Sequence, residues 1–113
     1  MNDLVVCEAL GQIHNDPGQP WTVASLAAEV GLSRSSFAAH FTNLVGETPL
    51  YYLTSWRMQL ARSWLCGTSL SLGELAERLG YQSDDAFKRA FRREVGSAPG
   101  SYRKQARSES LTT

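Results

Sequence analysis

Apolar side chains recur every three to four positions along several stretches of this chain, a period typical of amphipathic helices. The first stretch covers about 3–15, where Val6, Leu10 and Ile13 stand at i, i+4 and i+7. An Asp-Pro-Gly sequence follows at 16–18, and proline cannot continue a helix whereas glycine permits a turn. We therefore expect one short helix that ends before this turn.

A helix-turn-helix unit is expected at about 22–46. Thr22 and Ser33 carry hydroxyls that can cap helix N-termini. The two helices present these apolar side chains: Val23, Leu26, Ala27, Val30, Phe37, Phe41 and Val45. The glycines that end them are Gly31 and Gly46. Trp21, just ahead of the first cap, is expected either to pack back on Leu26 or to belong to the core.

A second helix-turn-helix unit is expected at about 71–96. Ser71 and Glu74 have the S-x-x-E spacing of a capping box. Gly80 suits the left-handed residue at a helix end, and Ser83 can cap the next helix. The apolar positions are Leu72, Leu75, Ala76, Leu79, Ala86, Phe87, Ala90, Phe91 and Val95. The opposite face of the second helix carries Lys88, Arg89, Arg92 and Arg93. A basic helix after a tight turn favours nucleic-acid binding.

One long helix is expected between the two units, at about 49–66. Thr48 and Pro49 suit its first positions, and Gly67 suits the position just after its end. Its apolar stripe consists of Leu53, Trp56, Leu60 and Trp64. Such a helix would span roughly 27 Å, which approaches the roughly 34 Å between successive major grooves on one face of B-DNA. We interpret Arg57, beside the stripe, as half of an ion pair that braces the two units.

The two helix-turn-helix units are copies of each other, with one residue inserted in the later turn. At least nine identical residues recur in register between 26–52 and 75–102. The matched pairs are Leu26 with Leu75, Ala27 with Ala76, Gly31 with Gly80, Ser33 with Ser83, Phe37 with Phe87, Phe41 with Phe91, Gly46 with Gly96, Pro49 with Pro99 and Tyr52 with Tyr102. Two copies indicate a duplicated module, because a solenoid needs at least three units.

Charge is distributed unevenly between the two halves of the chain. The total is zero, whereas a nucleic-acid-binding domain commonly has a pI above ~9. Residues 1–56 hold one basic and five acidic side chains, a net charge of −4, and residues 57–113 hold ten basic and six acidic ones, a net charge of +4. Within 86–107, seven basic residues stand against Glu94 alone. This asymmetry fits a surface that faces phosphates, although a solvated helix face would also produce it.

The remaining composition excludes several classes of protein. With 113 residues, 42% of them hydrophobic and 19% charged, the chain suits one compact unit or two very small ones and is not disordered. No apolar run approaches the ~18 residues of a membrane span. The N-terminus is acidic where a secretory signal would be basic, so a cytoplasmic location is expected. No Ser-His-Asp, paired-carboxylate or metal-binding pattern favours an enzyme or a cofactor.

Isolated reactive side chains are expected to be structural. Cys7 and Cys66 lie far apart in the sequence, and we expect buried, reduced thiols in place of a zinc site. His14 is expected to be structural, at the end of the first helix. Residues 105–113 are expected to form a flexible tail.

Over about residues 4–104, the sequence resembles the DNA-binding domain of the AraC/XylS family of bacterial transcription regulators. The resemblance rests on PWTVASLAAEVGLSRSSFAAHF, YYLTSWRMQLARSWL and GYQSDDAFKRAFRREVGSAPGSYR. It implies an all-α fold of about seven helices, in which two helix-turn-helix units are joined by a long helix and each recognition helix enters one of two successive major grooves. It also implies double-stranded promoter DNA as a partner, with RNA polymerase and an N-terminal sensor or dimerisation domain, commonly a cupin, as further partners.

The DNA-contacting positions implied by this resemblance lie on both recognition helices. In the first they are Arg34, Ser35, Ser36, Ala38, Ala39 and Thr42, and in the second they are Ser83, Asp84, Asp85, Lys88, Arg89 and Arg92. Ala38 and Ala39 cannot hydrogen-bond a base edge but can contact a thymine methyl group, whereas Arg89 can bond both O6 and N7 of guanine. Asp84 and Asp85 either accept from cytosine N4 or stabilise the first helical turn. We expect the second unit to supply a large share of the affinity.

The main alternative is a protein-interaction module whose basic face at 86–107 binds an acidic partner. The two functions differ in their response to salt, because binding to phosphates weakens steeply as salt rises.

Overall fold

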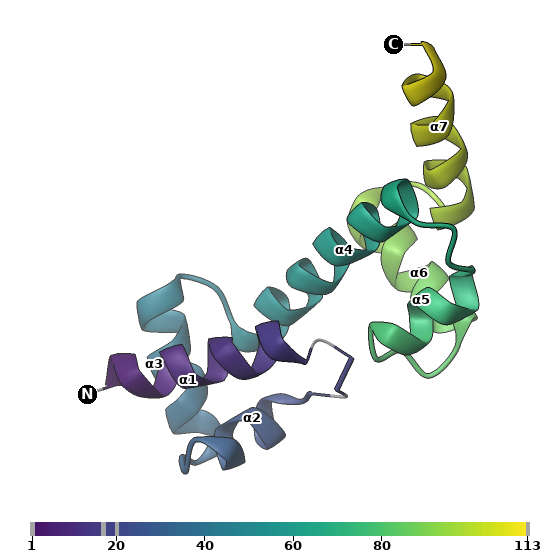
Figure 1. Ribbon diagram of the computed structural model, residues 1–113. Coiled ribbons are helices and arrows are strands. Elements are labelled where there is room, and N and C mark those ends of the chain that lie inside the picture. Colours follow the sequence, from purple (N-terminus) through teal and green to yellow (C-terminus); the bar gives the residue numbers. More distant parts are fainter. Residues whose placement is uncertain (1, 17, 20, 113) are drawn as a thin grey trace. The chain divides into compact units, whose positions relative to one another are not determined.

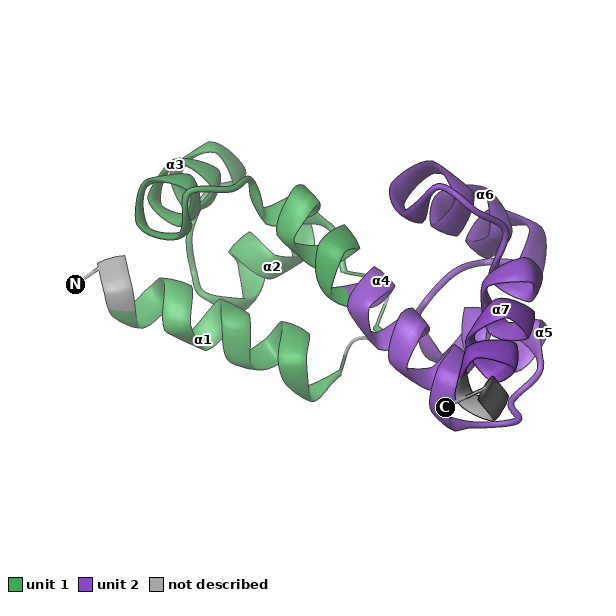
Figure 2. Cartoon of the chain, turned by 90° about the horizontal axis from the view of Figure 1, so that it is seen from above, with its two compact units in different colours: residues 1–56 green, residues 57–113 purple. Residues whose placement is uncertain are grey.

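The computed structural model describes residues 2–16, 18–19 and 21–112, and this part of the chain contains seven α-helices and no strand (Figure 1). The helices are α1 (Asn2–Asn15), α2 (Val23–Glu29), α3 (Arg34–Val45), α4 (Pro49–Gly67), α5 (Leu72–Arg78), α6 (Asp84–Val95) and α7 (Pro99–Thr112). The predicted all-α fold with two helix-turn-helix units is confirmed. The chain divides into two compact units, residues 1–56 and 57–113, and their boundary falls within α4 (Figure 2).

The first unit has its own apolar core, built from α1, α2, α3 and the start of α4. Its buried members are Val6, Ala9, Ile13, Trp21, Leu26, Ala27, Phe37, Phe41 and Leu53. Of the two roles expected for Trp21, the core position is confirmed. Its indole Nε1 donates a hydrogen bond to the Asp16 carbonyl oxygen at 2.8 Å, so the ring is buried with its polar atom satisfied.

The second unit has a separate core, to which the rest of α4 contributes with α5 and α6. Its buried members are Met58, Ala61, Leu65, Leu75, Ala76, Leu79, Phe87, Ala90 and Phe91. The stripe residues Leu60 and Trp64 are partly buried and pack against this core, but its fully buried residues from α4 lie at other positions. The second unit packs on a neighbouring face of α4, and 3.6 residues per turn place 58, 61 and 65 together on that face.

The duplication extends to a third helix in each unit. In α1, Val6, Ala9 and Ile13 are fully buried at i, i+3 and i+7. In α4, Met58, Ala61 and Leu65 are buried at the same spacing. The later half of α4 therefore serves the second unit as α1 serves the first, which the sequence comparison of 26–52 with 75–102 did not include.

Aromatic packing repeats with nearly the same geometry in both units. The ring centroids of Phe37 and Phe41 are 5.7 Å apart, and those of Phe87 and Phe91 are 5.8 Å apart. Tyr52 meets Phe41 edge-on at 5.8 Å, as Tyr102 meets Phe91 at 5.5 Å. Edge-to-face contacts of this kind are favourable beyond the area they bury. The matched Phe, Phe and Tyr positions therefore hold the recognition helix and the following helix together in each copy.

The predicted caps at Thr22, Ser33, Ser71 and Ser83 are confirmed. Thr22 and Ser71 each form a capping box with the residue three positions on, which is Ser25 in α2 and Glu74 in α5. The recognition helices are capped by serine in the same way. Ser33 Oγ accepts from the Ser36 amide at 3.2 Å, and Ser83 Oγ accepts from the Ala86 amide at 3.1 Å. Positive φ occurs among the described residues only at the glycines Gly31, Gly46, Gly80 and Gly96.

Two local predictions are wrong. Gly67 is not the residue after α4 but its last helical residue, and Thr68 ends the helix by donating from its amide and hydroxyl to the Trp64 carbonyl oxygen, at 3.0 and 2.6 Å. Cys7 and Cys66 were expected to be buried, but their thiols are exposed. Each comes directly after a buried residue, Val6 or Leu65, and the next residue of a helix lies away from the buried face. α7 continues well beyond Tyr102 to residue 112, and the flexibility expected for residues 105–113 stays a prediction.

Candidate nucleic-acid interface

The recognition helix of the first unit, α3, has one buried and one open face. Phe37 and Phe41 anchor the buried face. The predicted contact residues on the open face are Arg34, Ser35, Ala39 and Thr42, which are exposed, and Ser36 and Ala38, which are partly buried. Apart from Arg34, this face carries no charge. Arg34, at the start of the helix, can donate bidentately, and the central positions of the helix offer hydroxyls and methyl groups to a base edge.

The recognition helix of the second unit, α6, has the same architecture and a different surface. The predicted contact residues Ser83, Asp84, Asp85, Lys88, Arg89 and Arg92 are all exposed. Lys88, Arg89 and Arg92 form no ion pair or hydrogen bond within the described part of the chain. Three cations on one exposed helix face are available to phosphates or base edges.

The first turn of α6 also carries Asp84 and Asp85, which face the positive end of the helix dipole. That position stabilises the helix whether or not a base lies nearby. The oxygen of Ser83 accepts one hydrogen bond in capping, and its hydroxyl proton is available to a ligand.

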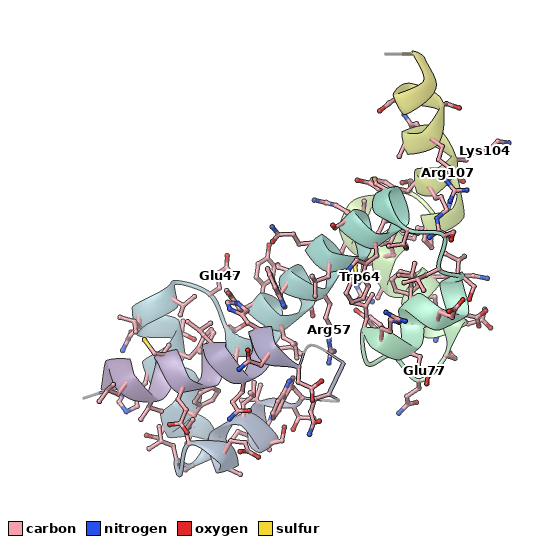
Figure 3. All side chains as sticks on the ribbon, in the orientation of Figure 1. Glu47, Arg57, Trp64, Glu77, Lys104 and Arg107 are labelled. Atoms are coloured by element: carbon pink, nitrogen blue, oxygen red, sulfur yellow. The ribbon has the colours of Figure 1, made fainter. Side chains whose placement is uncertain are left out.

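The basic stretch 86–107 is not one uniform surface. Arg93 pairs with Glu94 at 2.9 Å. Arg103 is turned inward, where it donates to the carbonyl oxygens of Leu65 at 3.1 Å and Thr68 at 3.3 Å. Lys104 and Arg107 project from α7 (Figure 3). Two of the seven basic residues are thus used inside the unit, which leaves less charge for the alternative interaction with an acidic protein.

Arg57 makes a cation–π contact within the second unit. Its guanidinium carbon lies 5.7 Å from the centroid of the Tyr81 ring, within the range of a favourable contact. Burial lowers the pKa of Arg57 and raises that of the Tyr81 hydroxyl. The ion pair between units that we expected for Arg57 stays a prediction.

His14 has the structural role that its sequence context indicated. Its Nε2 lies 2.7 Å from the Tyr52 hydroxyl oxygen, and its ring packs 4.6 Å from the Trp56 ring. Burial, with a smaller contribution from the charge of Glu47, raises the pKa of Tyr52. The described residues contain no group of three His, Cys, Asp or Glu side chains able to hold a metal ion. Nor does any described helix have the length and hydropathy to cross a membrane.

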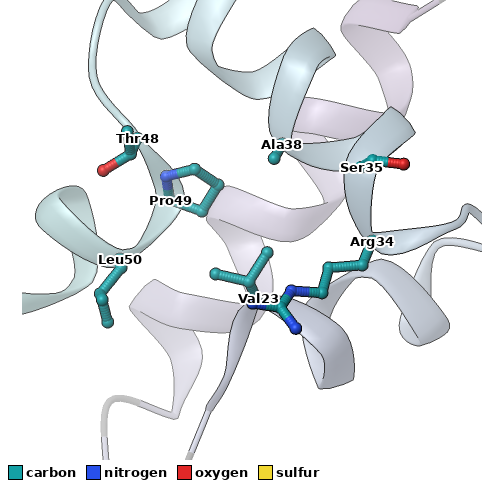
Figure 4. A pocket seen from close by; sticks show the side chains of 7 residues that line it. All are labelled: Val23, Arg34, Ser35, Ala38, Thr48, Pro49 and Leu50. Atoms are coloured by element: carbon teal, nitrogen blue, oxygen red, sulfur yellow. The ribbon is translucent and has the colours of Figure 1, made fainter.

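Sequence reasoning missed an apolar hollow beside α3, with a volume of about 460 Å³. Its lining residues are Val23, Arg34, Ser35, Ala38, Thr48, Pro49 and Leu50 (Figure 4). Three of these were predicted as DNA contacts, and the others come from the starts of α2 and α4. The available signal was Leu50, an apolar residue that directly follows the Thr48-Pro49 helix start and is 60% exposed. The hollow depends on three elements meeting, which periodicity does not reveal.

Known proteins match this chain over most of its length. The family model described as "Helix-turn-helix domain" matches residues 26–105. The transcriptional regulator AlkR of Acinetobacter baylyi is 44% identical over 98 residues, which are 87% of this chain and 32% of that protein. The chain spans about a third of the length of the curated relatives it matches.

Two solved structures share the fold. The DNA-binding domain of AdpA, a global transcriptional factor solved with a target DNA, superposes with a TM-score of 0.86 and 32% identity over 92% of this chain and 94% of that one. A regulator with an AraC-type DNA-binding domain from Chromobacterium violaceum gives a TM-score of 0.78 and 25% identity over 92% and 93%. With its duplicated helix-turn-helix units, the chain belongs to the AraC-type DNA-binding domains of bacterial transcription regulators.

Proposed function

We propose that this chain binds double-stranded promoter DNA and that α3 and α6 each enter one of two successive major grooves. The observation that carries the proposal is the pair of capped recognition helices, each anchored by two buried phenylalanines and open on its other face. The AdpA domain, solved with its target DNA, supports the same use of the fold. Because its target is chromosomal DNA, the protein would act in the bacterial cytoplasm.

The proposed contact residues divide by chemistry. Arg89 is suited to a guanine in the major groove, and Lys88 and Arg92 are suited to phosphate or guanine. On α3, Arg34 is suited to phosphate, and the serines and Thr42 offer hydroxyls to phosphate oxygens. Phosphate contacts set the position of the protein, and base contacts set its preference. The second unit would therefore supply most of the electrostatic affinity.

A salt titration tests this function. A duplex recovered by selection from a random pool should bind, and log K should fall linearly with log salt by about 0.9 per phosphate contacted. Several basic side chains are exposed, so we expect a slope equal to several such contacts. If no duplex binds at low salt, the proposal is ruled out. If an acidic protein binds with a similar dependence on salt, the alternative interaction module is favoured.

Two further partners belong to this proposal at the level of the whole regulator. RNA polymerase is one, and an N-terminal sensor or dimerisation domain is the other. The chain spans about a third of its curated relatives, and those longer proteins are transcriptional regulators by name. Transcription in vitro with purified polymerase, with and without this chain on the selected duplex, would show whether the domain alone changes promoter output.

A further inference from the structure

The hollow beside α3 is apolar although it opens on the face proposed to meet DNA. Its apolar walls are the side chains of Val23, Ala38, Pro49 and Leu50, and the other lining residues are Arg34, Ser35 and Thr48 (Figure 4). Arg34 makes no hydrogen bond or ion pair within the described part of the chain. The hollow is open to solvent, so water covers its apolar walls in the absence of a ligand. Replacing that water with apolar surface is favourable.

Among the groups that line the major groove, only one is apolar. The edges of adenine, guanine and cytosine present hydrogen-bond donors and acceptors, and thymine adds a 5-methyl group beside its O4 acceptor. The hollow offers that methyl group an apolar wall and offers polar edges little in return. Arg34, with its fixed positive charge, matches the phosphate next to such a base. The chemistry of the hollow therefore fits the methyl edge of thymine with its flanking phosphate.

We propose that this hollow makes the first unit a thymine reader, with Ala38 as the specificity-determining residue and Arg34 as the phosphate contact. The inference rests on the proposed DNA-binding function and gives α3 a reading role although alanines stand at its centre. Of the apolar walls, Ala38 lies on α3 itself and is only partly buried, so a base can reach it. In the second unit the matching position is Lys88, which has no comparable preference for a methyl group.

Replacing thymine with deoxyuridine tests the inference, because this removes the methyl group and leaves every hydrogen-bonding group in place. The selected duplex is synthesised with one such replacement at a time, and each version is titrated with the full chain. Burial of a methyl group contributes about 0.8 kcal/mol, and at 1.4 kcal/mol per tenfold this is about a fourfold change in Kd. We expect a loss of about that size at one or two thymines.

Variants show whether the hollow is responsible. Ala38→Asn should abolish the difference between thymine and deoxyuridine at those positions, and Leu50→Ser, in an exposed wall, should reduce it. Lys88→Asn is the matched control in the other copy: it should weaken binding overall and leave the ratio unchanged. Circular dichroism confirms that each variant is folded.

The possible outcomes distinguish a failure of the thymine reader from a failure of the proposed DNA-binding function. Tight, salt-sensitive binding with no deoxyuridine effect at any position would overturn the thymine reader and leave DNA binding intact. A deoxyuridine effect that persists in both Ala38→Asn and Leu50→Ser would also overturn it, because the methyl group would then lie elsewhere. No binding to any duplex would remove both proposals.

Discussion

The two units of this chain share one buried framework and have different surfaces. Phe37 and Phe41 correspond to Phe87 and Phe91 in position, burial and ring geometry. The first unit has a net charge of −4 and a recognition helix with alanines at its centre, whereas the second has a net charge of +4 and three free cations on α6. Buried positions are constrained by packing, and exposed ones are not. A duplicated scaffold therefore does not imply duplicated recognition.

The two units also differ in the side chains that cap their helices. The capping box of α2 is made by two hydroxyl side chains, Thr22 and Ser25, while that of α5 uses Ser71 and an ionisable residue, Glu74. Both satisfy the same backbone donors. Only the second makes its cap sensitive to acid, so the two units should differ in pH response as well as in charge.

The largest expected effect tests whether the two cores are independent. Phe37→Ala and Phe87→Ala each leave a cavity in a fully buried site and should cost about 3–5 kcal/mol. Amide hydrogen exchange, measured unit by unit, should show lost protection in the unit that carries the change. Equal loss in both units from a single change would mean that the chain unfolds as one body.

The next effect tests the asymmetry of recognition. Arg89→Ala should weaken binding to the selected duplex by about 1–3 kcal/mol and blur the preference at one base position. Arg93→Ala is the control, since it removes the same charge from the same helix but from a side chain paired with Glu94. Equal weakening on all sequences would make Arg89 a phosphate contact and would contradict its assignment to guanine.

A smaller effect tests the caps. Ser71→Ala and Thr22→Ala each remove the side-chain oxygen that accepts from the third amide of a helix, at 3.1 and 3.0 Å. Each should lower the free energy of unfolding of its unit by about 1 kcal/mol. Thermal denaturation followed by circular dichroism measures this. A negligible change in either variant would show that solvent satisfies those amides equally well.

The smallest effect concerns pH. Hydrogen bonds with Ser71 hold the pKa of Glu74 below its ordinary value. A lowered pKa means that the stabilisation is present above the ordinary value of about 4.3 and is lost as pH falls through the folded-state pKa. Glu74→Gln should remove this part of the acid dependence in the second unit, and Glu77→Gln, outside the box, should not. An unchanged pH profile in Glu74→Gln would contradict the assignment.

Signals carried by neighbouring residues were the most predictable from sequence. Ser33, Ser71 and Ser83 cap as expected because a cap depends on backbone groups two or three positions away. Phe37 and Phe87 are buried as expected because their spacing keeps them on one helical face. The same serine caps and paired phenylalanines occur in both units, so each unit supports the assignment in the other.

Features that depend on distant packing were not predictable in the same way. The large apolar residues of α4 indicated that the face with Trp64 packs on the second core. The face that is buried there carries Ala61, and Trp64 is only partly buried. Arg103 belonged by composition to a basic surface, but its hydrogen bonds to carbonyl oxygens near the end of α4 appear only in three dimensions. The contact positions on α3 and α6 were implied by the family resemblance, whereas the hollow formed by Val23, Ala38 and Leu50 was not foreseen.

The exposed cysteines have a practical consequence. The sequence contains two cysteines, Cys7 in the first unit and Cys66 in the second, and both thiols are free and exposed. Neither lies on α3 or α6. A pair of fluorescent maleimides would therefore place one dye on each unit with no change to the sequence. Energy transfer between the dyes, recorded while the duplex is added, would report how far apart the two units stand when both are engaged.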